Sequence, residues 1–152
     1  VEEGLSKLDW LVVRDFTETE SATFWKEGRR VRDGLVRPED IGTEVFLMPT
    51  AIAGEKAGSF TNTHRLIQWH DHVVDAPGDS RSELWFMAHL GRRLKELYAG
   101  SDAPENAPIN ALTLDYPFTG EREEPDAEAV LREINGWTVT DGELLSSFTD
   151  LK

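Results

Sequence analysis

The 152-residue sequence contains no cysteine. This absence excludes a disulfide framework, a zinc site built on thiolates, an iron–sulfur cluster and a cysteine nucleophile within these residues. No apolar run reaches the roughly 18 residues that a transmembrane helix needs, so we expect no membrane span. No signal or twin-arginine segment opens the sequence, and the chain itself is therefore silent on export.

Basic residues are also scarce. Sixteen Lys and Arg stand against 29 Asp and Glu, which gives a formal net charge of −13. A chain this acidic cannot neutralise phosphates in bulk, so nucleic acid is not an expected partner. The apolar fraction of 39%, with five Trp and seven Phe, indicates a folded globular chain of one-domain size.

Two short apolar runs, residues 10–13 and 44–48, have the composition of strands. The first is continuous, β-favouring and too short for a helix, which is typical of a parallel strand covered on both faces. About thirty residues with a helical segment separate the runs, so a crossover connection predicts neighbouring parallel strands. The predicted fold class is α/β: a three-layer, partial Rossmann-like domain with helices on both faces and an irregular C-terminal extension.

The strongest helix signal covers residues 81–99. Ser80 and Glu83 have capping-box spacing, apolar residues recur at helical intervals, and Gly100 stands at the expected end. A shorter helix is predicted between a Ser21 cap and Gly28.

After residue 100 the composition changes. Residues 101–108 form a Pro-containing linker, and residues 127–134 predict another helix with Pro125 in its first turn. We therefore divide the chain into residues 1–100 and an extension, residues 101–152.

The first candidate site follows the first strand. Asp15 ends that strand, and Thr19, Glu20 and Ser21 come soon after it. Ligands of open α/β sheets bind outside the carboxyl ends of strands, where an Asp accepts hydrogen bonds from a guanine edge or a ribose hydroxyl. The alternative is an Asx-turn and a helix cap that only close the loop.

The second candidate site lies in residues 58–68, where residues 58–63 are interpreted as a mobile loop flanked by glycine and residues 66–69 as a short extended segment. Its polar members offer an amide, hydroxyls and a guanidinium that suit a polar or phosphorylated ligand. The alternative is a structural Arg ion pair and an Asn turn. The candidate residues are Gly58, Asn62, Thr63, Arg65 and Gln68.

The run from Trp69 to His72 also raises the question of a metal. His70 and His72 would lie on one side of a strand, but no further ligand cluster follows, so a surface or interdomain role is the better interpretation. We predict no metal ligand and no catalytic residue in this chain.

Several of these segments together resemble one family. The strand at residues 43–49, the connector at 53–58 and the string at 58–68 are similar to the molybdopterin oxidoreductases, specifically the catalytic (alpha) subunit of formate dehydrogenase. Residues 7–25 and 43–100 carry the best motifs, including Pro-Gly-Asp-Ser-Arg-Ser-Glu-Leu before the long helix. The tail motifs at 115–117 and 142–148 resemble the membrane-associated, nitrate-inducible type.

This resemblance implies a cofactor, molybdopterin guanine dinucleotide with molybdenum or tungsten. Asp15 and Thr19 map to positions near its guanosine end, and Glu20 and Ser21 map less directly. Asn62 would face the pterin or its linker and Arg65 the pyrophosphate. The cysteine or selenocysteine that binds the metal, and the iron–sulfur cluster, must lie elsewhere, so this chain alone should not oxidise formate.

The resemblance also implies partners and a location. The chain begins at Val1 without Met, and we expect it to be a piece of a larger alpha subunit that works with an iron–sulfur beta subunit. The parent enzyme would lie at the extracytoplasmic face of a membrane, with a cytoplasmic location left open, and the isolated piece should self-associate. Two alternatives remain: another molybdopterin oxidoreductase of the nitrate or thiosulfate reductase type, or a cofactor-free α/β interaction module.

Overall fold

The computed structural model describes residues 1–63 and 65–135, which form two compact units. The first unit comprises Val1–Ile52 and Ala76–Arg81, and the second comprises the described residues of 53–75 and 82–135. The tail motif at residues 142–148 lies outside the described residues.

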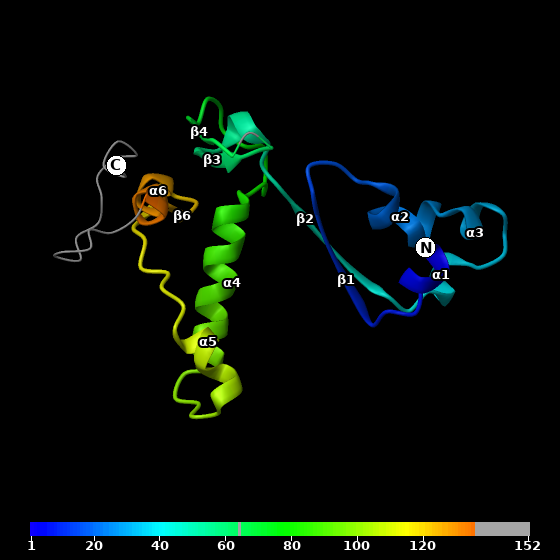
Figure 1. Cartoon of the computed structure of the whole chain (residues 1–152). Coiled ribbons are helices and arrows are strands. Elements are labelled where there is room, and N and C mark those ends of the chain that lie inside the picture. The colour runs from blue at the N-terminus through cyan, green and yellow to red at the C-terminus, as the bar shows by residue number, and fades with distance from the viewer. Residues whose placement is uncertain (64, 136–152) are drawn as a thin grey trace, which may run out of the picture. The chain divides into compact units, whose positions relative to one another are not determined.

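The first unit is built on two parallel strands (Figure 1). Strand β1 pairs with β2 from Trp10 opposite Glu44 to Asp15 opposite Pro49. This confirms the α/β class and the predicted parallel pair, because α2 and α3 lie in the crossover between the strands. The elements are α1 (Glu2–Leu5), β1 (Trp10–Asp15), α2 (Glu20–Glu27), α3 (Arg29–Arg32), a 3-10 turn (Pro38–Asp40) and β2 (Glu44–Pro49).

Glu2 of α1 caps the start of α3. Gly28 precedes α3 and has no side chain with which to cap it. The Glu2 carboxylate instead accepts the backbone N–H groups of Arg29 and Arg30 at 2.8 and 3.0 Å. These hydrogen bonds, with Arg30 N–H the larger contributor, lower the pKa of Glu2.

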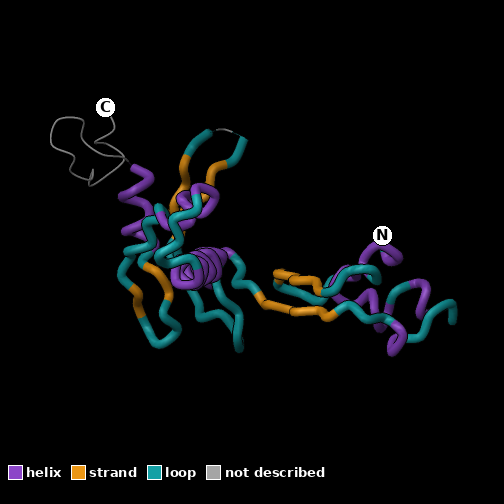
Figure 2. The backbone as a smooth tube through the Cα atoms, turned by 90° about the horizontal axis from the view of Figure 1, so that it is seen from below, coloured by secondary structure: helices purple, strands orange, loops and turns teal. Residues whose placement is uncertain are grey.

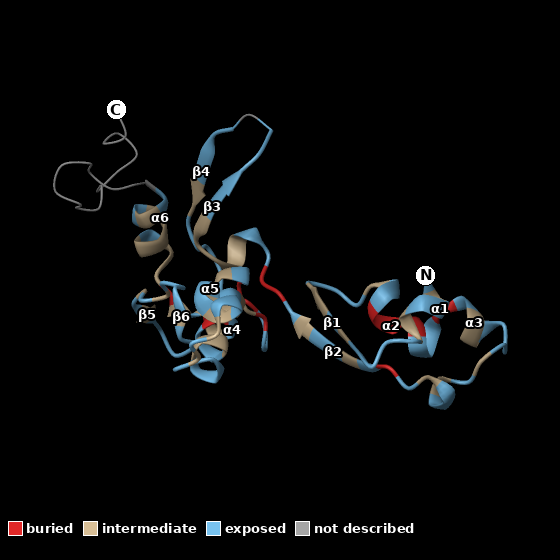
Figure 3. Ribbon diagram, turned by 60° about the horizontal axis from the view of Figure 1, so that its bottom comes forward, coloured by how far each residue is buried: buried red, intermediate tan, exposed pale blue. Residues whose placement is uncertain are grey.

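The strands are less covered than their sequence predicts. Trp10 is 63% exposed, and Val12 and Phe46 on the same face of the sheet are also exposed (Figure 3). The expectation of a strand covered on both faces is therefore wrong for the described residues. An apolar run shows that a strand favours burial, but it does not show that another layer is present to bury it.

The start of α2 also differs from the prediction. The helix begins at Glu20, so its N-cap is Thr19, and Ser21 lies within the first turn. The carbonyl of Thr19 accepts the N–H groups of Ala22 and Thr23 at 2.9 and 3.1 Å, which starts the helix earlier. Thr and Ser have similar capping preferences, so composition alone does not choose between them. The predicted end of the helix at Gly28 is confirmed.

The second unit contains an antiparallel hairpin, a long helix and shorter elements around that helix (Figure 2). The interpretation of residues 58–63 as a loop is wrong for residues 58–61, which form β3, and the predicted extended segment near residue 67 is confirmed as β4. Phe60 and Thr61 favour a strand, and the flanking glycine does not prevent it. The elements are a 3-10 turn (Ala53–Glu55), β3 (Gly58–Thr61), β4 (Ile67–His70), α4 (Glu83–Leu97), a 3-10 turn (Pro104–Asn106), α5 (Ala107–Asn110), β5 (Phe118–Thr119), β6 (Glu124–Pro125) and α6 (Ala127–Asn135).

Helix α4 is confirmed, but its cap is not the predicted one. The N-cap is Ser82, whose Oγ accepts the backbone N–H of Trp85 at 2.8 Å. The predicted capping box from Ser80 is therefore wrong, because the helix begins two residues later than that spacing requires. Helix α6 is also confirmed, although Pro125 lies in β6 and not in its first turn.

Candidate functional site

Asp15 stands at the carboxyl end of β1, the position expected for a ligand-binding residue of a parallel sheet. Its backbone carbonyl accepts the N–H of Thr50 at 3.1 Å, and its Oδ1 accepts the N–H of Phe16 at 2.8 Å. The side chain is half-buried. A carboxylate with one oxygen held by the backbone presents the other oxygen in a fixed direction as an acceptor.

The other residues of this first cluster form the start of α2. Thr19 is half-buried, and its side chain makes no capping hydrogen bond, whereas Glu20 and Ser21 are exposed. The first N–H groups of a helix have no partner within the helix, so they add donors to this end of the sheet. The cluster therefore combines carboxylates, hydroxyls and amides on one strand–loop–helix segment.

The carboxylates decide which ligand groups suit this first cluster. Asp15 and Glu20 repel phosphate and accept hydrogen bonds from amino, imino and hydroxyl groups. A nucleobase edge and a ribose provide such donors. These acceptors suit the nucleoside end of a dinucleotide better than its pyrophosphate.

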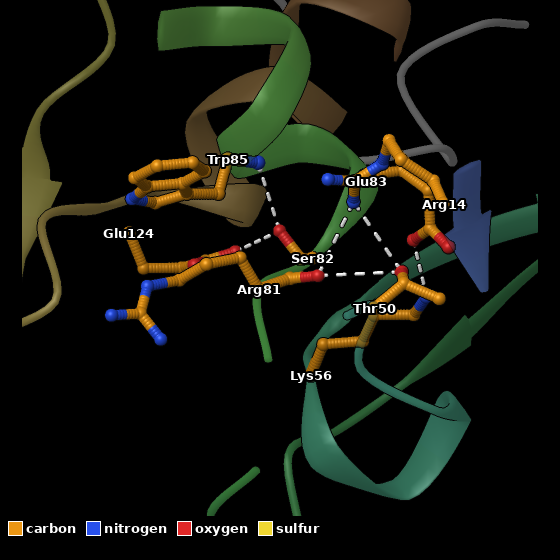
Figure 4. Close-up of polar contacts among 8 residues, drawn as sticks. All are labelled: Arg14, Thr50, Lys56, Arg81, Ser82, Glu83, Trp85 and Glu124. Atoms are coloured by element: carbon orange, nitrogen blue, oxygen red, sulfur yellow. Dashed lines mark hydrogen bonds and ion pairs between the residues drawn. The ribbon is translucent and has the colours of Figure 1, made fainter. Parts of the chain in front are cut away.

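Sequence reasoning missed a third strand-like contact at this edge of the sheet. Thr50 is buried and forms a parallel bridge with Arg81, whose carbonyl accepts the Ala51 N–H at 3.0 Å. The Arg14 guanidinium lies 3.4 Å from both Thr50 Oγ1 and the Arg81 carbonyl oxygen (Figure 4). The only sequence signal was a Thr two residues after the second apolar run.

The second cluster lies on the β3–β4 hairpin. Asn62 Nδ2 donates to Gln68 Oε1 at 3.1 Å, and the Arg65 N–H donates to the Asn62 carbonyl at 3.0 Å. Asn62, Thr63, Arg65 and Gln68 are all exposed. Arg65 has a φ of 60°, in the left-handed region that non-glycine residues rarely adopt. Within residues 1–63 and 65–135, the Arg65 guanidinium makes no ion pair, so it remains available to an anion.

Gly58 does not have a steric role in this hairpin. It pairs with His70, and a Cβ at Gly58 would lie 3.7 Å from His70 Nε2, an ordinary contact. The two clusters belong to different units of the chain. That they share one cofactor stays a prediction.

The side chains of residues 69, 70 and 72 contact other side chains of this unit. His72 Nε2 lies 3.3 Å from Asp75 Oδ1, and Trp69 Nε1 donates to Asp71 Oδ1 at 2.8 Å. His70 packs against Phe60, with ring centroids 6.0 Å apart. Among the described residues, no group of three or more His, Asp or Glu side chains is placed to hold a metal ion.

Polar contacts at the start of α4 fasten the β5–β6 hairpin to the helix. Ser82 Oγ donates to the Glu124 carboxylate while it accepts the Trp85 N–H (Figure 4). Trp85 Nε1 donates to the Arg122 carbonyl at 2.8 Å, and Lys56 pairs with Glu83.

No described helix has the length and apolar character needed to cross a bilayer.

Comparison with known proteins gives a consistent result, although no protein-family model matches the chain. The nitrate-inducible formate dehydrogenase major subunit of Escherichia coli (strain K12) is 34% identical over 97% of this chain. The formate dehydrogenase major subunit of Haemophilus influenzae is 32% identical over 98% of it. The formate dehydrogenase subunit alpha of Megalodesulfovibrio gigas is 30% identical over 91% of it.

The chain is much shorter than these relatives. It spans 15% of the length of the Escherichia coli and Haemophilus influenzae proteins and 13% of the Megalodesulfovibrio gigas protein. Nearly the whole chain aligns in each case, so the similarity is not confined to one motif. This chain is a homologue of one segment of the formate dehydrogenase major (alpha) subunits.

Proposed function

We propose that these residues form part of the cofactor-binding domain of a formate dehydrogenase catalytic subunit. That subunit would oxidise formate to carbon dioxide and pass two electrons to iron–sulfur clusters. The observation that carries the proposal is the 34% identity over 97% of the chain, combined with Asp15 and Thr19 at the carboxyl end of a parallel strand.

The proposed cofactor is molybdopterin guanine dinucleotide with molybdenum or tungsten. Asp15, Thr19, Glu20 and Ser21 would hold its guanosine end by accepting and donating hydrogen bonds. Arg65 would neutralise a phosphate, and Asn62 and Gln68 would orient a neighbouring polar group through their amides. Gly58 and Thr63 belong to the same hairpin. When bound, the metal centre supplies the two-electron chemistry.

The chain's own residues have a limited share in this reaction. Binding and orientation are within the reach of its carboxylates, amides and guanidinium, but the sequence has no thiolate to ligate the metal. The metal ligand must come from another part of the subunit. The 152-residue chain should therefore show no formate oxidation, even when it is supplied with the cofactor.

The exposed strands support the proposal that a larger subunit surrounds these residues. Parallel sheets are found almost only with both faces covered, yet Trp10, Val12 and Phe46 are exposed on one face. The remaining length of the alpha subunit would supply this cover. We also propose an iron–sulfur beta subunit as partner and a location at the extracytoplasmic face of a membrane.

The test uses the full-length catalytic subunit. Asp15→Ala and Arg65→Met should each lower the content of bound pterin dinucleotide, measured by mass spectrometry of the released cofactor, together with formate-dependent dye reduction. Asp33→Ala and Arg93→Met are matched controls, because they remove the same charges from the exposed C-cap of α3 and from an exposed position on α4.

Full cofactor content and full activity in both site variants would refute the assigned roles. Reduction of nitrate or thiosulfate by the parent enzyme, without oxidation of formate, would move it to another molybdopterin enzyme. Absence of any pterin cofactor from the full-length protein would favour the interaction module.

A further inference from the structure

One face of α4 carries a continuous apolar row. Met87, Leu90, Leu94 and Leu97 are spaced by three, four and three residues along the helix. This is the spacing of the apolar positions in a helix–helix seam, where each side chain inserts between side chains of a facing helix. We call these four residues the α4 seam.

The face of α4 next to this seam is already occupied by residues of this chain. Ala88 is buried, and Gly91 is so close to the following segment that a Cβ there would lie 2.5 Å from Leu114 Cδ1. Lys95 donates to the Leu112 carbonyl on the same side. The β5–β6 hairpin and the chain before α6 also lie to one side of the helix (Figures 1 and 2).

The α4 seam, in contrast, is open. Met87 is 61% exposed, Leu90 41% and Leu97 64%, and Leu94 is half-buried. A helix with an apolar stripe must bury it against another element to be stable. Within the described part of the second unit, the buried apolar side chains are only Ala88 and Pro125. These described residues therefore do not form a complete hydrophobic core by themselves.

We propose that the α4 seam is the packing surface for an apolar helix from another part of the same catalytic subunit. This inference rests on the proposed function, since the chain spans 15% of the relatives' length and most of such a subunit lies outside these residues. A stripe confined to this three–four–three spacing is the narrow seam of helix–helix packing, which favours a helix over a sheet as the occupant.

Folding order and charge support an occupant within the same polypeptide. A domain completes its core when its own chain folds, before it meets other subunits. The charged neighbours of the seam are also satisfied, because Arg93 pairs with Glu96 at 2.9 Å on α4 itself. The α4 seam therefore offers apolar contact without an unpaired charge that a partner would have to match.

Cysteine labelling tests this proposal, because the chain has no native cysteine. Leu90→Cys should react readily with a maleimide in the 152-residue chain. In the full-length catalytic subunit, purified without its partner subunits, its labelling rate should fall by about tenfold or more. Mass spectrometry of the peptide that contains residue 90 reads the rate in both proteins. Glu96→Cys, on an exposed side of the same helix, is the control and should react at similar rates in both.

Each other result overturns the proposal. Equally fast labelling of residue 90 in both proteins would show that the seam stays in water, and equally slow labelling would show that the 152-residue chain covers it by itself. Protection only when partner subunits are present would assign the surface to another subunit, and concentration-dependent protection in the 152-residue chain would assign it to a second copy. Met87→Cys repeats the measurement at a more exposed position if Leu90→Cys disturbs folding, which circular dichroism would detect.

The labelling result does not depend on the cofactor. A protected seam in a subunit that binds no pterin cofactor would refute the proposed function and leave this inference standing. A cofactor-loaded subunit with a reactive seam would do the reverse.

Discussion

Ser82 is the residue whose replacement should most directly weaken the second unit. Its Oγ accepts the Trp85 N–H at 2.8 Å and donates to the Glu124 carboxylate, so one hydroxyl both caps α4 and fastens the β5–β6 hairpin. Ser82 is 4% exposed, and water therefore cannot replace the lost bonds in Ser82→Ala.

The expected loss is the sum of two effects. Removal of a Ser N-cap costs about 1 kcal/mol. The hydrogen bond to a carboxylate would add about 1.5–3 kcal/mol if Glu124 were fully buried, and about 1 kcal/mol is reasonable for a half-buried group. We expect Ser82→Ala to lower the free energy of unfolding by about 2 kcal/mol. Ser82→Thr, which keeps the hydroxyl, should recover most of it.

Urea unfolding followed by circular dichroism measures this loss, and a cycle with Glu124→Gln separates the two contributions. Hydrogen exchange at the Trp85 amide provides a local readout, which Ser82→Ala should accelerate. Ser80→Ala is the informative comparison, because it leaves the bond between Ser82 and the Trp85 amide in place. Faster exchange of the Glu83 amide in Ser80→Ala, with the Trp85 amide unchanged in Ser82→Ala, would show that the capping box predicted from sequence is the true cap.

Three further changes follow from described contacts. Folding lowers the pKa of Glu2, so the stability that Glu2 contributes is present above its unfolded value of 4.5 and is lost as the pH falls through its folded-state pKa. In a series of urea titrations at different pH, Glu2→Gln should remove this loss of unfolding free energy at acid pH. Burial, and after it the Glu133 carboxylate, raises the pKa of Tyr116 to about 12. The chain should therefore lose stability as the pH rises from 10 towards 12. Tyr116→Phe should abolish that loss in the same kind of urea titrations. Gly91→Ala should change the unfolding free energy by less than about 1 kcal/mol, because the Leu114 methyl can rotate away and Ala favours the helix. Gly91→Leu should cost about 2 kcal/mol or more. A large loss in the alanine variant would show that Leu114 cannot move.

The sequence predicted the elements whose residues all favour one state. The apolar runs at 10–13 and 44–48 are parallel neighbours because a helical crossover permits little else, and α4 and α6 follow from apolar residues at helical spacing. The position of Asp15 at the end of β1 follows from the same reading. These features are local, or they depend on one well-constrained connection.

At two helices the sequence analysis chose the wrong cap from similar residues, Ser21 and Ser80. Thr19 and Ser21 are both good caps, as are Ser80 and Ser82, and only the hydrogen bonds of the folded chain select Thr19 and Ser82. The role of Glu2 at the start of α3 could not be predicted either, because it needs two segments that are far apart in the sequence to meet.

Burial and long-range contacts were decided by tertiary structure alone. Composition marks Trp10 and Leu90 as apolar, but whether another layer covers them depends on what packs there, and in the described residues both are exposed. Likewise, the bridge between Thr50 and Arg81 and the bond between Ser82 and Glu124 join segments that no periodicity relates. Hydrophobic pattern fixes which faces seek burial, because it is a property of each residue, whereas the partner of each face is a property of the folded chain.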